Sequence, residues 1–317
     1  MSKYYSPFRY PGGKRKLANY VKLLYRTNNL LDGEYAEPYA GGAAVALGLL
    51  YGEYVRRIYI NDIDRSIYAF WDAALLKTNE LCRLIRNVPV TMKEWERQKA
   101  VQEADDPDPL ELALSTFFLN RTNRSGIISG GVIGGKQQSG RWKIDARFNK
   151  SDLIKRIRKI GRYSSRIRLY NLDAEEFIKS VIPTLQPHSL IYFDPPYFIK
   201  GQQKLYTNFY SETDHKHIAT LISKLKYPWI ISYDNVDAIR TLYQHYRSVS
   251  YGISYSAQAR YQGKEALFFS DQLVMPEVDD PVRVRPKDLY QPNRIESYKL
   301  RVTLVRNSST LSNPSVQ

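Results

Sequence analysis

Short apolar strand patterns alternate with helical patterns along most of the chain, and this alternation constrains the fold more than any other feature. Strands that alternate with helices predict an α/β fold, with a mostly parallel sheet and helices on both of its faces. The strand patterns occupy residues 33–42, 56–64, 166–173, 189–194, 228–234, 247–255 and 265–271. The helical patterns occupy residues 43–51, 66–76, 174–182, 213–224 and 236–246. The last two strands have no helix between them, which predicts an antiparallel hairpin at one edge.

The alternation is interrupted between residues 79 and 163. Polar helices there flank the stretch NRTNRSGIISGGVIGGKQQSGRW, which is dense in turn formers and basic groups. We therefore expect one sheet domain, formed by residues 1–78 and 164–275, with a helical and hairpin insertion over residues 79–163. Residues 276–317 are proline-rich, polar and basic, which predicts a loosely packed tail.

The chain is strongly basic, with 47 Lys and Arg residues against 32 Asp and Glu residues and a net charge of +15. This excess favours a polyanionic partner, because Lys and Arg release counterions when they bind phosphates. The longest apolar stretch, GGAAVALGLLY, is too short to span a bilayer. No secretory signal precedes the first motif, so we expect a cytoplasmic location. Cys82 is the only cysteine, and the four histidines lack metal-ligand spacing, so we expect no metal site.

Four strand ends carry notable polar motifs: EPYAGG, INDID, YNLDAEE and FDPPY. In an open parallel sheet, ligands bind beyond the carboxyl ends of the strands. Gly41 and Gly42 allow a sharp turn and a close backbone approach to a ligand. Asp62 follows Gly41 by about twenty residues, the spacing at which an acid accepts both ribose hydroxyls of a nucleoside cofactor. Asp173 could accept from an adenine amino group or could cap the next helix.

The N-terminal stretch SPFRYPGGKRKL joins an aromatic residue, a tight glycine turn and Lys14. Such a turn can place a cation beside a carboxylate or an anion. It could equally be an ordinary basic loop that precedes a helix.

Taken in order, PFRYPGGK, EPYAGG, INDID and DPPY resemble the Dam-like class of DNA adenine-N6 methyltransferases, over most of residues 7–271. The resemblance implies a Rossmann-like methyltransferase sheet, S-adenosylmethionine as the methyl donor and a target-recognition insertion. It also implies double-stranded DNA as the partner, in the nucleoid of a prokaryote or in a phage. Whether a restriction enzyme or another defence component accompanies the protein is left open.

The resemblance also assigns residues to the cofactor. Tyr10, Lys14, Asp62 and Asp194 match the positions that contact the cofactor in that class. With the strand-end residues, the expected cofactor-binding set is Tyr10, Lys14, Glu37, Gly41, Asp62, Asp173 and Asp194. One position departs from the pattern, since the class often reads aromatic-x-Gly-x-Gly and Ala43 stands here at the last position.

The DPPY motif, with Asp194, Pro195, Pro196 and Tyr197 as the expected catalytic residues, suits a reaction at a planar amino group. The lone pair of such a group is delocalised into its ring, so the nitrogen is a poor nucleophile. The Asp194 carboxylate and the Pro195 carbonyl can accept both amino hydrogens and orient the lone pair. The prolines fix φ and hold that carbonyl rigidly. Tyr197 can stack on a base rotated out of the duplex, a contact of about 1–3 kcal/mol.

The insertion contributes three candidate DNA-binding residues in FFLNRTNRSG, namely Arg121, Asn123 and Arg124. Arg can pair with guanine and Asn with adenine in the major groove. Phosphate contact, or plain solubility, is the alternative for all three.

Other functions remain compatible with these motifs. The same site could methylate cytosine N4 in DNA or adenine in structured RNA, because DPPY suits any planar amino group. A nucleic-acid-binding module on a degenerate methyltransferase fold is a third reading, against which the intact Asp62, Asp194 and Tyr197 argue.

Overall fold

A seven-stranded sheet forms the body of the protein. The computed structural model describes residues 5–9, 14–198, 210–255 and 261–290, with the side chains of residues 253–263 excepted. The strand order is β3-β2-β1-β4-β5-β7-β6. The first five are parallel, and β7 and β6 add an antiparallel hairpin at one edge, so the predicted fold class is confirmed. The strands are β1 (Gly33–Glu37), β2 (Val55–Asn61), β3 (Ile167–Tyr170), β4 (Leu190–Phe193), β5 (Trp229–Asp234), β6 (Arg247–Tyr255) and β7 (Tyr261–Phe269).

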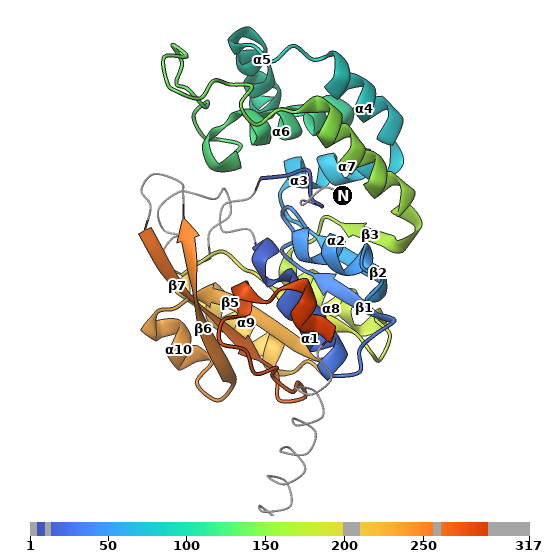
Figure 1. Cartoon of the computed structure of the whole chain (residues 1–317), viewed down its shortest axis with the longest axis vertical. Helices are drawn as coiled ribbons and strands as arrows, with labels where there is room; N and C mark the ends of the chain where they lie inside the picture. Colours follow the sequence, from blue (N-terminus) through green and yellow to red (C-terminus); the bar gives the residue numbers. More distant parts are fainter. Residues whose placement is uncertain (1–4, 10–13, 199–209, 256–260, 291–317) are drawn as a thin grey trace, which may run out of the picture.

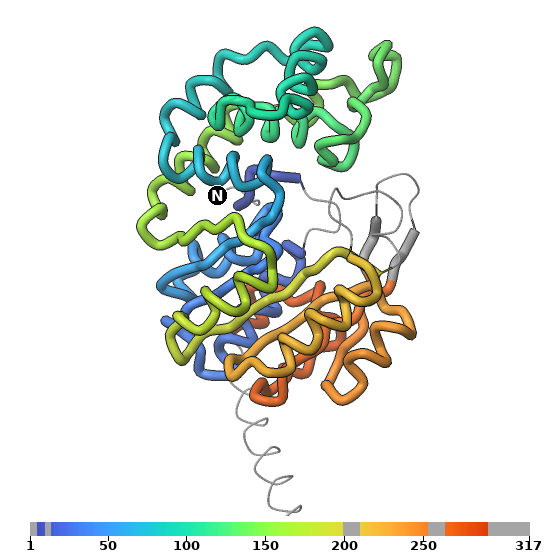
Figure 2. The backbone as a smooth tube through the Cα atoms, turned by 180° about the vertical axis from the view of Figure 1, so that it is seen from behind, coloured from blue at the N-terminus to red at the C-terminus, as the bar shows by residue number. Residues whose placement is uncertain are grey.

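Helices cover both faces of the sheet. Figure 2 shows α8 (Ala174–Ser180), α9 (Glu212–Ser223) and α10 (Asp237–Leu242) across one face. On the other face lie the 3₁₀ helix η1 (Lys14–Leu17), α1 (Ala18–Thr27) and α2 (Ala44–Leu50), with α3 (Arg65–Leu76) at its upper end (Figure 1). Successive strand residues enter opposite cores: Leu190 and Tyr192 join one, and Ile191 and Phe193 the other. Burial on both faces explains why β4 reads as a continuous apolar run.

The insertion is a helical lobe that shares its apolar core with the sheet domain. It contains α4 (Thr78–Asn87), α5 (Met92–Glu103), α6 (Pro109–Thr122), η2 (Arg124–Gly126) and α7 (Lys150–Arg162), and lies beyond α3 (Figure 1). Phe70 of α3 stacks on Phe117 of α6, with ring centroids 5.9 Å apart, and also contacts Phe8. The short helices η3 (Ser164–Arg166) and η4 (Ile182–Thr184) flank β3 and α8.

The N-terminal segment is fixed to the insertion through Asn120. The backbone N–H of Arg9 donates to Asn120 Oδ1 at 2.8 Å, and Asn120 Nδ2 donates to the carbonyls of Arg9 (2.7 Å) and Gly126 (2.9 Å). Gly126 has φ of +81°, and a Cβ there would lie 2.2 Å from the Arg9 carbonyl oxygen. Only glycine permits this approach, so the turn after α6 and residues 5–9 are held together.

Part of the expected tail packs on the body, which corrects the prediction of a loosely packed segment. Residues 276–290 include η6 (Pro281–Arg283) and η7 (Pro286–Tyr290), and Val284 and Leu289 are buried in the main core. Asn19 of α1 donates to the Val284 carbonyl at 2.9 Å. The few apolar residues here are widely spaced, so composition concealed their packing. Among the described helices, none is long and apolar enough to cross a membrane.

Candidate active site

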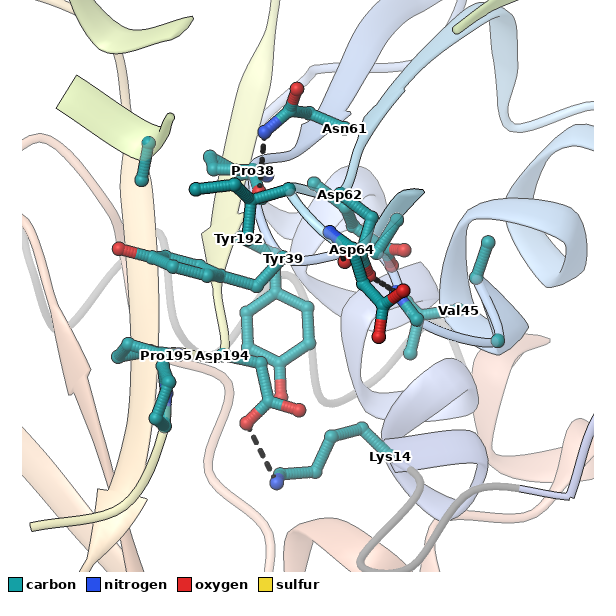
Figure 3. A pocket seen from close by; sticks show the side chains of 18 of the residues that line it. Lys14, Pro38, Tyr39, Val45, Asn61, Asp62, Asp64, Tyr192, Asp194 and Pro195 are labelled. Carbon is teal, nitrogen blue, oxygen red and sulfur yellow. Dashed lines mark hydrogen bonds and ion pairs between the residues drawn. The ribbon is translucent and has the colours of Figure 1, made fainter. Parts of the chain in front are cut away.

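The carboxyl ends of β1, β2 and β4 and the loop after β3 meet at one cavity, as the sequence predicted. Its volume is about 350 Å³, within the range of small-molecule sites. Figure 3 shows side chains from these ends around the cavity, with Lys14 approaching Asp194 from η1. The expected residues among its lining are Lys14, Glu37, Gly41, Asp62, Asp173, Asp194, Pro195, Pro196 and Tyr197. Tyr10 lies outside the described residues.

Asp62 is held by backbone donors at the end of β2. The N–H groups of Gly41 and Asp64 donate to its two carboxylate oxygens at 2.9 and 3.0 Å. Burial nevertheless raises the pKa of Asp62 to about 7, and the nearby Asp64 adds to the rise. Each oxygen keeps acceptor capacity after one hydrogen bond. Asp62 therefore fits a pair of vicinal hydroxyls, such as those of a ribose.

The turn between β1 and α2 uses left-handed backbone at two positions. Gly41 has φ of +46° and Ala43 has φ of +44°. Trp71 Nε1 donates to the Gly41 carbonyl at 2.9 Å, which fixes the turn. The alanine that departs from the family pattern thus occupies a conformation that favours glycine, at a cost of about 1–2 kcal/mol.

Glu37 and Asp173 lie on the cavity wall with different surroundings. Glu37 is buried, and its Oε1 accepts from Tyr35 Oη (3.0 Å) and the Ala46 N–H (3.1 Å). Burial raises the pKa of Glu37 to about 8. Asp173 is exposed and caps α8 by accepting from the Glu175 N–H at 2.8 Å. Both roles considered for Asp173 are compatible, because a capping carboxylate can also accept from a ligand.

Asn61, which the sequence analysis did not single out, ties three strand ends together. Its Nδ2 donates to the carbonyls of Pro38 (2.9 Å) and Leu172 (3.0 Å), and its Oδ1 accepts from the Leu172 N–H at 2.9 Å. Its only sequence signal was an amide at the end of an apolar strand. Asn61 fixes the loops that carry Glu37, Asp62 and Asp173.

Asp194 is anchored through one of its two carboxylate oxygens. Oδ1 lies 2.8 Å from Lys14 Nζ and accepts from Ser232 Oγ at 2.8 Å. Among the described residues, Oδ2 has no hydrogen-bond or ion-pair partner, and 28% of the side chain is exposed. Burial raises the pKa of Asp194, against the effect of Lys14. The arrangement presents one fixed acceptor beside Pro195 at the cavity.

A second carboxylate, Glu265 of β7, lies behind Asp194 and was missed from the sequence. Tyr197 Oη donates to Glu265, and Lys14 Nζ lies 3.5 Å from Glu265 Oε2. Lys14 Nζ also donates to Tyr197 Oη at 2.6 Å. Glu265 is fully buried. A glutamate at the start of the apolar run EALFF was the only signal available.

The three candidate DNA-binding residues differ in exposure. Asn123 is fully buried, and its amide bonds Trp95 Nε1 and two backbone carbonyls, so it cannot read a base in this conformation. The Arg121 guanidinium donates to the carbonyls of Arg147 and Pro7. Burial lowers the pKa of Arg121 to about 9, with help from neighbouring arginines. Arg124 is exposed in a turn.

Solved structures of other methyltransferases are similar at low sequence identity. A putative RNA methyltransferase from Pyrococcus horikoshii is 9% identical, with 83% of this chain and 86% of that chain covered and a TM-score of 0.40. TrmK of M. capricolum, in complex with S-adenosyl-homocysteine, is 11% identical, with 92% and 88% covered and a TM-score of 0.32. The rRNA methyltransferase AviRa of Streptomyces viridochromogenes is 11% identical, with 82% and 85% covered and a TM-score of 0.33. No curated protein matches the chain.

A family model matches residues 10–257, which include the strand ends, the cavity and the whole insertion. The model describes a family of methyltransferases, whose methyl donor is S-adenosylmethionine. The cavity fits it, since Asp62 offers ribose acceptors and Gly41 a close backbone approach. The chain belongs to the family of D12 class N6 adenine-specific DNA methyltransferases.

Proposed function

We propose that this methyltransferase modifies N6 of adenine in duplex DNA, with the target base rotated out of the helix. The observation that carries the proposal is Asp194, which is fixed through Oδ1 and keeps Oδ2 for a ligand at the cavity. Pro195 follows it directly and lines the same cavity, so its carbonyl is the second acceptor. A base still paired inside a duplex cannot reach such a site.

In the proposed reaction, Asp194 and Pro195 accept the two hydrogens of the amino group and direct its lone pair outward. S-adenosylmethionine, which Asp62 and Gly41 would hold, would supply the methyl group from its sulfonium and keep the electron pair of the carbon–sulfur bond. The amino nitrogen becomes positive, and one of its hydrogens then leaves as a proton towards Asp194. Lys14 and Ser232 keep the carboxylate in place, which is preorganisation in the sense of electrostatic catalysis. Tyr197 lines the cavity and is the candidate stacking residue.

The charge of the insertion supports DNA as the substrate. Arg9 and Arg147 lie close enough to Arg121 to lower its pKa, and Arg147 also lowers the pKa of Arg9, so positive charge accumulates where the N-terminal segment meets the insertion. We assign Arg121 and Arg147 to phosphate contacts, and Arg124 to a groove. Trp142 is 56% exposed, with the guanidinium carbons of Arg141 and Arg147 at 5.4 and 5.6 Å from its ring centre.

A nucleoside digest tests the proposal. Duplex DNA, single-stranded DNA and structured RNA are each incubated with enzyme and labelled S-adenosylmethionine, then digested to nucleosides. We expect N6-methyldeoxyadenosine from duplex DNA. The matched control is Glu176→Gln, an exposed acid on α8, which should retain activity that Asp194→Asn loses. N4-methylcytosine, or label in RNA alone, would contradict the proposed substrate.

A binding assay separates recognition from catalysis. Trp71, Trp95 and Trp229 are buried, so Trp142 dominates any fluorescence change caused by a surface ligand. Duplex DNA should change this signal in the wild type and in Asp194→Asn alike. The signal should be absent in Trp142→Phe. If wild type and Trp142→Phe methylate DNA equally and DNA does not change the fluorescence of either, the DNA binds away from Trp142.

A further inference from the structure

Glu265 connects three elements that surround the reactive carboxylate. Its Oε1 accepts from Tyr197 Oη, and its Oε2 accepts from Tyr251 Oη at 2.9 Å. Lys14 Nζ lies between the two acids, 2.8 Å from Asp194 Oδ1 and 3.5 Å from Glu265 Oε2. The side chain of Glu265 is 0% exposed, and that of Lys14 is 5% exposed. An ionised carboxylate loses its hydration on burial, so the burial of Glu265 costs stability unless its bonding partners compensate.

We propose that Glu265 is a positioning residue for methyl transfer, which acts on Asp194 through Lys14 and holds Tyr197 by its hydroxyl. The proposal rests on the proposed function of Asp194 as the acceptor at the target amino group. Glu265 is not among the residues that line the cavity. Its effect is exerted through the charge and the geometry of its neighbours.

The charges explain why a second acid is useful here. With one acid alone, Lys14 would neutralise Asp194 and weaken it as an acceptor. Among the described residues of this cluster, two carboxylates face one ammonium, and the resulting negative charge lies beside the amino nitrogen, which becomes positive as the methyl group arrives. A fixed negative charge at that point stabilises the transition state more than the ground state. Glu265 supplies this charge from a place that the substrate does not occupy.

The distances place the two acids within range of each other. Both contact the same ammonium nitrogen, so their oxygens lie within roughly 6 Å, where like charges shift each other's pKa. Glu265 accordingly raises the pKa of Asp194, although burial contributes most. Among the described residues, the other titratable groups that interact with Asp194 or with Lys14 include Lys14 itself, Glu37 of β1, Tyr192 of β4, Tyr197 after β4 and Tyr251 of β6.

The test measures the pKa of Asp194 directly and compares it with activity. Nuclear magnetic resonance of isotope-labelled Asp carboxyl carbons gives the titration, and Asp194→Asn assigns the resonance. In Glu265→Gln, which keeps the shape, the pKa of Asp194 should fall by about one unit. The acid limb of kcat should move to lower pH in parallel. kcat should fall about tenfold or more with KM for S-adenosylmethionine nearly unchanged.

Two further variants separate charge from packing. Tyr251→Phe removes a buried hydrogen bond to Glu265 but no charge, so it should lower the melting temperature without moving the pKa of Asp194. Lys14→Met with Glu265→Gln removes one charge of each sign. In this double variant the pKa of Asp194 should be lower than in Lys14→Met alone, a comparison that does not require the single variant Glu265→Gln to fold.

The outcomes are distinct. A pKa of Asp194 that is the same in the wild type and in the folded Glu265→Gln variant would overturn the proposal. So would an equal pKa of Asp194 in Lys14→Met and in the double variant. If wild-type enzyme transfers no methyl group to adenine in DNA, the proposed function fails, while the resonance titration still decides whether Glu265 acts on Asp194.

Discussion

The carboxyl edge of the sheet and the turn after α6 both bury polar side chains, yet they use them differently. In the turn, Asn120 and Asn123 donate both amide hydrogens to backbone carbonyls and accept with the remaining oxygen. At the sheet edge, Asp194 bonds other described residues through Oδ1 only, and Asp62 accepts one backbone donor on each oxygen. The turn is therefore complete within the chain, whereas the edge retains acceptors for a ligand.

The difference shows that a buried polar residue marks a functional site only when it keeps bonding capacity that faces a cavity. A saturated amide adds stability and specifies a local structure. An acceptor with spare lone pairs, held by a cation and a hydroxyl, is arranged for something outside the chain. The four predictions below change two residues of the sheet edge and two of the turn, one at a time, and compare function with stability.

The largest effect is expected from Asp194→Asn. The side-chain nitrogen of Asn donates hydrogen bonds and cannot accept one from the amino group of the target base. Methyl transfer should therefore fall by about a thousandfold or more. The melting temperature should change little, because the variant keeps the volume of the side chain. Single-turnover kinetics with duplex DNA measure the loss. Turnover within tenfold of wild type would remove Asp194 from the catalytic role.

Asn123→Ala should act on stability. The change leaves Trp95 Nε1 and the carbonyls of Ile127 and Ile128 without their partner, at a cost of about 2–4 kcal/mol in unfolding free energy. Urea denaturation measures this loss of unfolding free energy. The control is Arg124→Ala, a change at the neighbouring exposed residue. Altered sequence preference at unchanged stability would restore Asn123 as a reader of bases.

Asp62 should make cofactor affinity depend on pH. Its pKa is raised to about 7, so the carboxylate is mostly protonated at lower pH and ionises as the pH rises. The ionised form is the stronger acceptor for hydroxyls. Affinity for S-adenosylmethionine should therefore increase about tenfold from roughly pH 6 to pH 8. Calorimetry of wild type and Asp62→Asn tests this, since the variant should lose most of the dependence.

Arg124→Ala should affect DNA recognition without affecting the methyl-transfer site. If the guanidinium reads a base, the loss should be about 1–3 kcal/mol against the correct site, with relaxed preference at one position. If it contacts phosphate, binding should weaken evenly and the salt slope should shrink by roughly one unit. Methylation of single-base variants at two salt concentrations separates these results. An unchanged preference and salt slope would place Arg124 outside the interface.

Sequence patterns predicted the strands, the edge hairpin and the strand-end acids, because each depends on local periodicity and spacing. They could not find Ser232 or Glu265, since the register of β4, β5 and β7 decides which polar residue lies beside Asp194. Asn123 and Arg124 are neighbours in the sequence with opposite exposure. Their difference in exposure depends on the hydrogen bond from Trp95 to Asn123 and on the left-handed backbone of Ser125, and composition predicts neither.

The network around Lys14 has a consequence for how the protein is made. Lys14 is synthesised early, but its partner Tyr197 follows 183 residues later and Glu265 later still. Arg9 likewise binds Asn120, which follows it 111 residues later. Contacts of such separation carry a loop-closure cost and form slowly. The reactive edge can close only after β7 has emerged from the ribosome, so a truncated nascent chain has no assembled active site.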